Sequence, residues 1–441
     1  MKHRPKLIAF CFLALMLLGT RSLMAQDSTR NITLKEAIDL SIKNSKQLKN
    51  NKAKIDEATA TLQEANDRKL PDFSVSASYL YLPINPDISL KTDTSKSGGG
   101  FPKVSQAMYG IANASYPLYT GGKINYGIES AKYLAQAAKL DADDNMQAVI
   151  LNTINAYSNL YKANATIAIV KENLNQSNQR VQDFTNLEKN GLVARNDLLK
   201  VELQSSNIEL ALLDAQSDYK ITSVNMDLML GLAEQTTLVP DSASLAQTTS
   251  VKNIQDYEQS ALQNRKDLAA IELRRKAADL GIKSAKSDYY PSIALTGGYI
   301  AAYIPSFISI TNAVDVGVGV QYNLSSLWKT KSKIAVAKAQ VDELTANEEM
   351  LDDNIRLQIN QAYQSYLVNQ KKIEVYQQAV DQANENYRIT KNKYDNSLAT
   401  TTDLLDADVA QLQAKLNAAN ASIDAVVAYN KLLQTAGLLN N

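Results

Sequence analysis

Residues 190–199 read NGLVARNDLL, and residues 396–405 read NSLATTTDLL. The two segments match at an offset of 206 residues. The same offset pairs Tyr116 with Tyr322. Nearer the N-terminus the matching offset is 220, which pairs Pro71 with Pro291. Alanine-rich helices match by chance at a few positions, but chance rarely holds one offset over more than about a hundred residues. The sequence therefore predicts a tandem duplication.

The change of offset from 220 to 206 gives the first copy 14 more residues than the second between its proline and its tyrosine. The excess includes Ser97, Gly98, Gly99 and Gly100. Runs of serine and glycine are typical of exposed loops, so we expect a long loop here.

Each copy has the pattern helix, strand, strand, long helix, long helix. Residues 34–69 and 254–289 are rich in Ala, Lys, Glu, Leu and Gln and contain no proline, which predicts two helices. Pro71 and Pro291 should end them, because proline lacks an amide donor and disfavours helical angles in the residue before it.

Alternating sequences follow both prolines and predict two-faced strands. Phe73, Val75 and Ala77 alternate with serines, and four valines at 314, 316, 318 and 320 alternate with polar or small residues. We expect β-hairpins over 72–119 and 292–323. An ordinary sheet packed on a soluble core would give the same alternation. Four strands with tyrosines near their ends favour a membrane barrel between lipid and a watery lumen.

The rest of each copy predicts long coiled-coil helices. Residues 123–189 contain no proline and no glycine after Gly127, and at about 1.5 Å per residue they would extend roughly 100 Å. Apolar and small residues then recur every three or four positions from Leu198 to Met229, and again from Leu404 to Leu432. A rod of this length cannot form the interior of a compact domain.

The first residues resemble a cleavable secretory signal, with Lys2, Arg4 and Lys6 before an apolar run that ends near Gly19. The only histidine, His3, and the only cysteine, Cys11, lie within it. A mature chain without them has no histidine base, cysteine nucleophile, Cys/His metal site or disulfide, so we expect neither an enzyme nor a bound cofactor.

Charge also excludes a nucleic-acid partner. The signal would remove Lys2, Arg4, Lys6 and Arg21 from 46 basic residues and none from 46 acidic ones, which leaves a net charge of −4. Nucleic-acid-binding proteins instead carry a basic patch.

Two hairpins supply four strands, whereas small closed barrels need about eight, and an open strand edge cannot lie in lipid. The chain must therefore oligomerise. Three copies would supply twelve strands, and helical hairpins at one end of the barrel would form a tube.

This organisation resembles the TolC family of outer-membrane factors over essentially the whole mature chain. The most specific marks are the two repeat-equivalent turns quoted above and the Tyr119, Thr120, Gly121, Gly122 segment, similar to the family's glycine pair after the strand. The fold class implied is mainly α with a small β part, built as a tandem repeat of long helical hairpins in an α-barrel coiled coil. Its four strands per chain contribute to a trimeric 12-stranded outer-membrane β-barrel.

The resemblance also implies roles for residues at the two turns. Asp403 and Asp406 would form acidic rings at a resting aperture, and Asp197 and Tyr394 would make gate hydrogen bonds between hairpins. The tips that contact a periplasmic adaptor would be Gly191, Leu192, Val193, Ser397 and Leu398. Two departures from the family stand out, Ala399 in place of a basic gate residue and Ser397 in place of a glycine.

A structural role competes with each assignment. Aspartates after a turn often cap a helix N-terminus, and Asp197 and Asp403, which match across the repeat, suit capping as well as gating. Asp406 has Lys200 at its repeat position and is the better candidate for the lumen. At the tips, glycine simply allows a tight turn.

We divide the chain into a signal peptide (1–25), a first repeat (26–230) with its tip near 191, a linker (231–253) and a second repeat (254–441) with its tip near 397. The expected function is a passive exit duct in the outer membrane, with its tunnel in the periplasm, for a tripartite efflux pump or type I secretion system. Its partners would be two further copies in a homotrimer, a periplasmic adaptor, an RND, ABC or MFS-type inner-membrane transporter, and outer-membrane lipid. The alternative is a non-channel periplasmic or surface coiled-coil protein.

Overall fold

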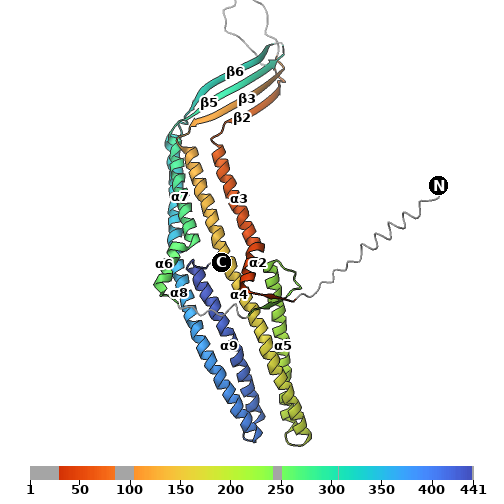
Figure 1. Cartoon of the computed structure of the whole chain (residues 1–441). Helices are drawn as coiled ribbons and strands as arrows, with labels where there is room; N and C mark the ends of the chain where they lie inside the picture. Colours follow the sequence, from red (N-terminus) through yellow and green to blue (C-terminus); the bar gives the residue numbers. More distant parts are fainter. Residues whose placement is uncertain (1–28, 85–103, 242–250, 306, 440–441) are drawn as a thin grey trace, which may run out of the picture. The chain divides into compact units, whose positions relative to one another are not determined.

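The computed structural model describes residues 29–84, 104–241, 251–305 and 307–439 (Figure 1). The expected signal peptide, the serine and glycine loop at 97–100 and residues 242–250 of the expected linker lie outside these ranges.

The described part of the first copy contains three strands, two shorter helices and two long helices. In chain order these are β1 (Thr29–Ile32), α2 (Leu34–Asn44), α3 (Lys46–Asp67), β2 (Asp72–Tyr81), β3 (Gln106–Tyr119), α4 (Lys123–Lys189) and α5 (Arg195–Leu230). The second copy repeats the order after β4 (Thr237–Pro240), with α6 (Ile254–Asn264), α7 (Lys266–Lys286), η2 (Ser287–Tyr289), β5 (Ser292–Ile304), β6 (Ile308–Gln321), α8 (Ser326–Asp395) and α9 (Thr401–Thr435).

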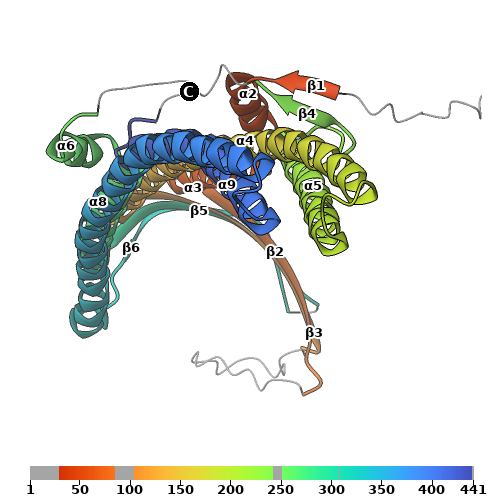
Figure 2. The same cartoon turned by 90° about the horizontal axis from the view of Figure 1, so that it is seen from below.

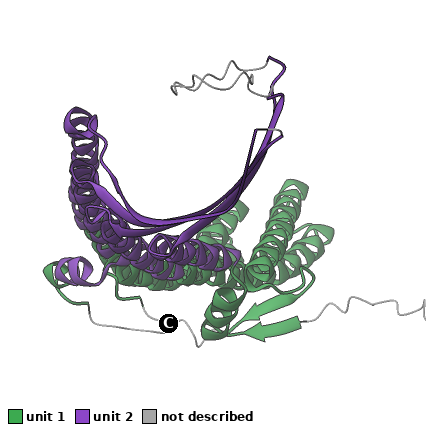
Figure 3. Ribbon diagram, turned by 90° about the horizontal axis from the view of Figure 1, so that it is seen from above, with its two compact units in different colours: residues 1–45, 147–256, 359–441 green, residues 46–146, 257–358 purple. Residues whose placement is uncertain are grey.

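The chain forms two compact units (Figure 3). Unit 1 comprises residues 1–45, 147–256 and 359–441, and unit 2 comprises residues 46–146 and 257–358. No helix in the described part of the chain has an apolar stretch long enough to cross a bilayer.

The helices expected over 34–69 and 254–289 are each broken once, so the prediction of single helices was wrong. Ser45 follows α2 with ψ at 121°, and Arg265 precedes α7 with ψ at 126°. Neither break has a glycine or proline. The Asn44 amide instead donates to the Leu230 carbonyl at 2.6 Å, a contact between distant residues that no local pattern reveals.

Unit 2 contains a four-stranded antiparallel sheet in the order β2-β3-β5-β6. The register places Val75 beside Ala112, Ala112 beside Tyr299, and Tyr299 beside Val314. Successive side chains point to opposite faces, so this row is apolar while the adjacent row holds Ser74, Asn113, Gly298 and Asp315. The sheet is two-faced, as its alternation predicted.

The return from β3 to α4 depends on two glycines with positive φ, Gly121 at 64° and Gly122 at 85°. A Cβ added to Gly121 would lie 2.8 Å from the Ser287 carbonyl oxygen, and the Ser287 hydroxyl donates to the Gly121 carbonyl at 2.8 Å. Glycine is required here both for the backbone angle and for this close approach.

Unit 1 has its main apolar core around Tyr157, which is fully buried beside Ile32, Leu160, Met226 and Leu238. The Tyr157 hydroxyl donates to the Ile32 carbonyl at 3.0 Å and accepts from the Asp241 amide at 2.9 Å. These bonds hold the small parallel sheet of β1 and β4 against the helices. Part of the expected linker is therefore an ordered strand.

Asp227 is a fully buried carboxylate near this core, and neither of its side-chain oxygens has a hydrogen-bond partner. Burial, with a smaller contribution from the negative charge of Glu234, raises the pKa of Asp227 to about 6. The repeat-equivalent position in α9 is Leu433. A carboxylate in this place destabilises the fold whenever it is ionised.

We expect Asp227→Asn to stabilise the protein at pH 8 by on the order of 2 kcal/mol and to change little at pH 4. Because the folded-state pKa lies above the unfolded value, stability falls as pH rises from about 4 to 6, and the loss persists above that range. Thermal unfolding midpoints across pH measure the effect, with the exposed Asp218→Asn on the same helix as control. Equal midpoint shifts at both pH values would contradict the assignment.

Candidate functional site

The two hairpin tips of unit 1 have the same backbone geometry, although one uses glycine and the other serine. Gly191 has φ at 71° and Ser397 has φ at 61°. The Leu192 amide donates to the Leu187 carbonyl at 2.9 Å, and the repeat-equivalent Leu398 amide donates to the Lys393 carbonyl at 2.7 Å. Helices α4 and α8 thus both end in the left-handed turn that closes many helix C-termini.

This geometry leaves one leucine protruding from each tip. Leu192 is 71% exposed and Leu398 is 77% exposed. We call this pair the tip leucines. Each tip thus presents one large apolar side chain to solvent.

Beneath the tips lies a small apolar cluster that joins the two hairpins. Its buried members are Phe184, Leu198 and Val201, and Tyr394 stacks on Phe184 with ring centroids 5.5 Å apart. Val193 packs against the same cluster, whereas the tip leucines point away from it.

The expected gate residues Asp197 and Tyr394 lie near each other at this cluster. Burial raises the pKa of Tyr394, a hydrogen bond with Thr401 opposes the change, and the charge of Asp197 adds to it. The Lys200 ammonium donates to Asp197 Oδ1 at 3.3 Å and to Thr402 Oγ1 at 3.4 Å. Lys200 therefore links α5 to α9, a contact that the sequence did not indicate.

Asp403 completes a capping box at the start of α9. Its Oδ2 accepts from the Thr400 amide at 2.8 Å and from the Thr400 hydroxyl at 2.7 Å, and the Thr400 hydroxyl accepts from the Asp403 amide at 3.2 Å. The hydrogen bonds from Thr400 lower the pKa of Asp403. Asp406 is exposed about one turn further along α9. The structure thus shows the capping role for Asp403 and leaves Asp406 accessible.

The most buried ion pair in the described part of unit 1 belongs to a cluster that sequence reasoning missed. Arg180 of α4 makes two hydrogen bonds of 3.0 Å to the carboxylate of Asp408 of α9, and a third of 3.0 Å to the hydroxyl of Tyr387 of α8. The exposed fractions of the side chains are 9% for Arg180 and 1% for Asp408. Burial disfavours the guanidinium charge, but the hydrogen bond and charge of Asp408 outweigh it and raise the pKa of Arg180.

A second ion pair joins α4 to α9 further from the tips, between Lys162 and Asp424. It is more exposed than the Arg180 pair. The residues of both pairs lie more than 200 positions apart, and of their four repeat positions only that of Asp424 carries the same residue type, so only the fold brings the pairs together.

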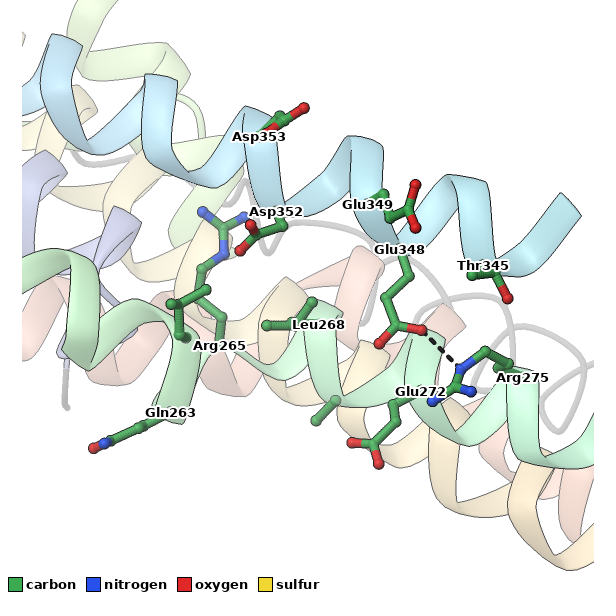
Figure 4. Close-up of a pocket in the computed structure, with 12 residues that line it drawn as sticks. Gln263, Arg265, Leu268, Glu272, Arg275, Thr345, Glu348, Glu349, Asp352 and Asp353 are labelled. Carbon is green, nitrogen blue, oxygen red and sulfur yellow. Dashed lines mark ion pairs between the residues drawn. The ribbon is translucent and has the colours of Figure 1, made fainter. Parts of the chain in front are cut away.

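Unit 2 contains a cleft of ≈ 740 Å³ between α7 and α8 (Figure 4). Glu272, Glu348, Glu349, Asp352 and Asp353 line it together with two arginines. Arg275 Nε lies 2.8 Å from Glu348 Oε2, which neutralises part of the acidic charge, whereas Arg265 is paired with Asp267. Within the described ranges, no group of three or more His, Cys, Asp or Glu side chains is placed to hold a metal ion.

The two-faced sheet and the paired helical hairpins define the class of TolC-like α-barrel channels. The chain belongs to the outer membrane efflux protein family, which it matches over residues 37–232 and 258–438. It is 23% identical over 330 residues to the outer membrane efflux protein BepC of Brucella suis, covering 73% of this chain and 70% of the relative.

Solved structures show the same fold. The outer membrane protein VceC of Vibrio cholerae superposes with a TM-score of 0.74 at 20% identity, over 92% of this chain and 96% of that one. The Campylobacter jejuni CmeC outer membrane channel superposes with a TM-score of 0.74 at 18% identity, over 92% and 86%. The predicted fold class, the family and the location in the outer membrane are therefore confirmed, and family and fold are those of channels rather than enzymes.

Proposed function

We propose that three copies of this chain form the exit duct of a tripartite efflux pump, opened by a periplasmic adaptor and an inner-membrane transporter. The observation that carries the proposal is the two-faced sheet. Its edge strands β2 and β6 pair on one side only within the described chain, and one face is apolar. Edge strands cannot remain unpaired in lipid, so the barrel closes only with further copies.

Efflux is favoured over protein secretion because the matching family and the relative BepC are both described as efflux proteins. RND, ABC and MFS-type transporters all remain possible sources of the substrate, because a passive duct accepts what its transporter delivers. The tip leucines are the proposed adaptor contacts, together with Gly191, Val193 and Ser397, whose roles are to shape the turns.

The aperture proposal assigns the inward-facing charge mainly to Asp406, because Asp403 also caps α9. Asp197 and Tyr394 are proposed to restrain the second hairpin through the cluster beneath the tips. Lys200 is added to this network, since it contacts both Asp197 and Thr402. Because residue 399 is an alanine, the second tip contributes no basic residue to this network at that position.

Asp406→Asn should reduce the cation preference of the channel and weaken its block by trivalent cations by on the order of tenfold, a change of about 1.4 kcal/mol. Three carboxylates would be lost from one narrow ring, where charges interact more strongly than in bulk water. Reversal potentials and blocking concentrations in planar lipid bilayers measure both effects.

Glu209→Gln, an exposed acid on α5, is the matched control and should leave selectivity unchanged. Unchanged selectivity in Asp406→Asn would remove Asp406 from the aperture. A purified chain that stays monomeric and outside membrane fractions would instead favour the coiled-coil alternative.

A further inference from the structure

A basic and apolar segment connects strand β6 of unit 2 to the first turns of α8 (Figures 1 and 2). From Val316 to Val341 the sequence has four lysines and no acidic residue. All four lysines are exposed, and they are Lys329, Lys331, Lys333 and Lys338. Exposed apolar side chains come just before them, at Leu324, Leu327 and Trp328. The segment thus combines positive charge with apolar surface at one end of the sheet.

The first copy begins its long helix without this chemistry. The positions equivalent to Trp328, Lys331 and Lys333 carry Gly122, Asn125 and Gly127. Both copies nevertheless go from a strand into a helix of similar length, α4 or α8. The tryptophan and the additional lysines are therefore not required to start such a helix.

Trp328 points away from the buried side of α8. Ser326 and Thr330 are buried, with exposed fractions of 8% and 1%. Each lies two residues from Trp328, and two residues correspond to a rotation of about 200° around an α-helix. The Trp328 side chain is accordingly 65% exposed. A large aromatic side chain thus stands on the outer side of the first turn of α8.

The lysines beside Trp328 carry charge that the chain does not neutralise. Lys333 shares the carboxylate of Asp288 with Lys123, at N–O distances of 2.5 Å and 2.8 Å. Among the described residues, no carboxylate lies within ion-pair distance of Lys329 or Lys331. The start of α8 is therefore a positively charged surface.

The place of this segment after β6 sets its depth in the membrane. Four valines of β6 are between 63% and 78% exposed on the apolar face of the sheet, and the strand ends at Gln321. Along α8, at about 1.5 Å per residue, Lys329 and Lys331 lie roughly 5–8 Å beyond the first residue, Ser326. The headgroup region on each side of a bilayer is also about 5–8 Å thick. Both lysines therefore reach the depth of the lipid headgroups.

We propose that the first turns of α8 bind the phosphate groups of anionic phospholipids in the periplasmic leaflet of the outer membrane. Lys329 and Lys331 supply the charge. The Trp328 ring lies at the boundary between acyl chains and headgroups, where tryptophan is enriched in membrane proteins. The proposal rests on the proposed channel, because only a barrel that crosses the membrane brings this segment to the leaflet.

A neighbouring copy of the chain is the competing occupant of this surface, and the charge favours lipid over it. Burying Lys329 and Lys331 against protein would require a carboxylate opposite each ammonium, since an unpaired buried charge is costly. Lipid phosphates instead surround a barrel at this depth and need no matching residue. Lysines near an anionic leaflet gain favourable electrostatic energy without leaving the aqueous headgroup region.

Trp328 is the only tryptophan of the sequence, so its fluorescence reports on this segment alone. The test reconstitutes the purified trimer in nanodiscs of phosphatidylcholine with a minority of phosphatidylglycerol, and the acyl chains of one lipid or of the other carry bromine as quencher. We expect brominated phosphatidylglycerol to quench at least about fivefold more per molecule than brominated phosphatidylcholine, the effect of one lysine near an anionic surface. High salt should reduce this preference, because it screens charges at the membrane surface.

Lys329→Gln combined with Lys331→Gln should make the two lipids equally effective quenchers. Lys338→Gln is the matched control, because Lys338 is an exposed lysine of the same helix about 10 Å further from the strand than Lys331. The control should keep the preference for phosphatidylglycerol. Equal quenching by both lipids in the unchanged protein, or a preference that survives the double variant, overturns the proposal.

Oligomer size, measured before reconstitution, separates this proposal from the proposed channel. A trimer in which neither brominated lipid quenches Trp328 places the ring against a neighbouring copy, which overturns the lipid site while the channel stands. A chain that is monomeric in detergent and does not insert into membranes overturns the channel and the lipid site together.

Discussion

Asp408→Ala should lower the free energy of unfolding by about 3–5 kcal/mol, because it leaves Arg180 charged and buried without its carboxylate. Three hydrogen bonds of Arg180 join α4, α8 and α9, and two of them end on Asp408. The same change should raise the conductance of the resting channel, since the second hairpin would lose its most buried link to the first. Denaturant titration in detergent and single-channel recordings measure the two effects.

Two further variants make this prediction specific. Asp424→Ala removes a more exposed ion pair between the same helices and should cost no more than about 1 kcal/mol. Arg180→Met combined with Asp408→Leu removes both charges and should restore most of the stability, because apolar replacements of buried ion pairs are often neutral. If Asp408→Ala were as mild as Asp424→Ala, the Arg180 cluster would not be a restraint.

Leu192→Asp combined with Leu398→Asp should abolish efflux while leaving the amount of trimer in the outer membrane unchanged. Both tip leucines are exposed, so their replacement costs the fold little. Burying a leucine in a partner contributes about 1.5–3 kcal/mol, so losing it should weaken adaptor binding at least about tenfold per tip. Intracellular accumulation of a fluorescent substrate and crosslinking to the adaptor measure the loss.

Asn190→Asp adds one negative charge beside the first tip but keeps both leucines, and should leave efflux near normal. Normal efflux in the double leucine variant would move the adaptor contact away from the tips. Loss of efflux in Asn190→Asp as well would indicate that charge, rather than apolar contact, governs docking.

The features that the sequence predicted well are those carried by local pattern or by the repeat. Alternation from Phe73 and from Val314 gave the two-faced strands, and the matching turns placed both tips where Gly191 and Ser397 have positive φ. Proline and glycine positions alone did not predict the breaks at Ser45 and Arg265, because a contact with Leu230 accompanies the first of them.

The candidate site was less predictable because its contacts connect residues far apart. The repeat could not indicate Arg180 with Asp408, since the equivalent positions hold Asn386 and Glu202. Asp403 fitted both capping and gating from sequence, and only the geometry of Thr400 shows the cap. Gating by Asp197, Tyr394 and Asp406 remains a prediction that electrophysiology must test.

The lengths of the strands set the thickness of membrane that the barrel can cross. Ten residues in β2 extend about 33 Å, which a tilt of roughly 40° reduces to about 25 Å, close to the apolar height typical of outer-membrane barrels. Strand β6 has 14 residues and at the same tilt would reach about 35 Å. Around a closed barrel the rim would therefore rise and fall by about 10 Å, once for each copy.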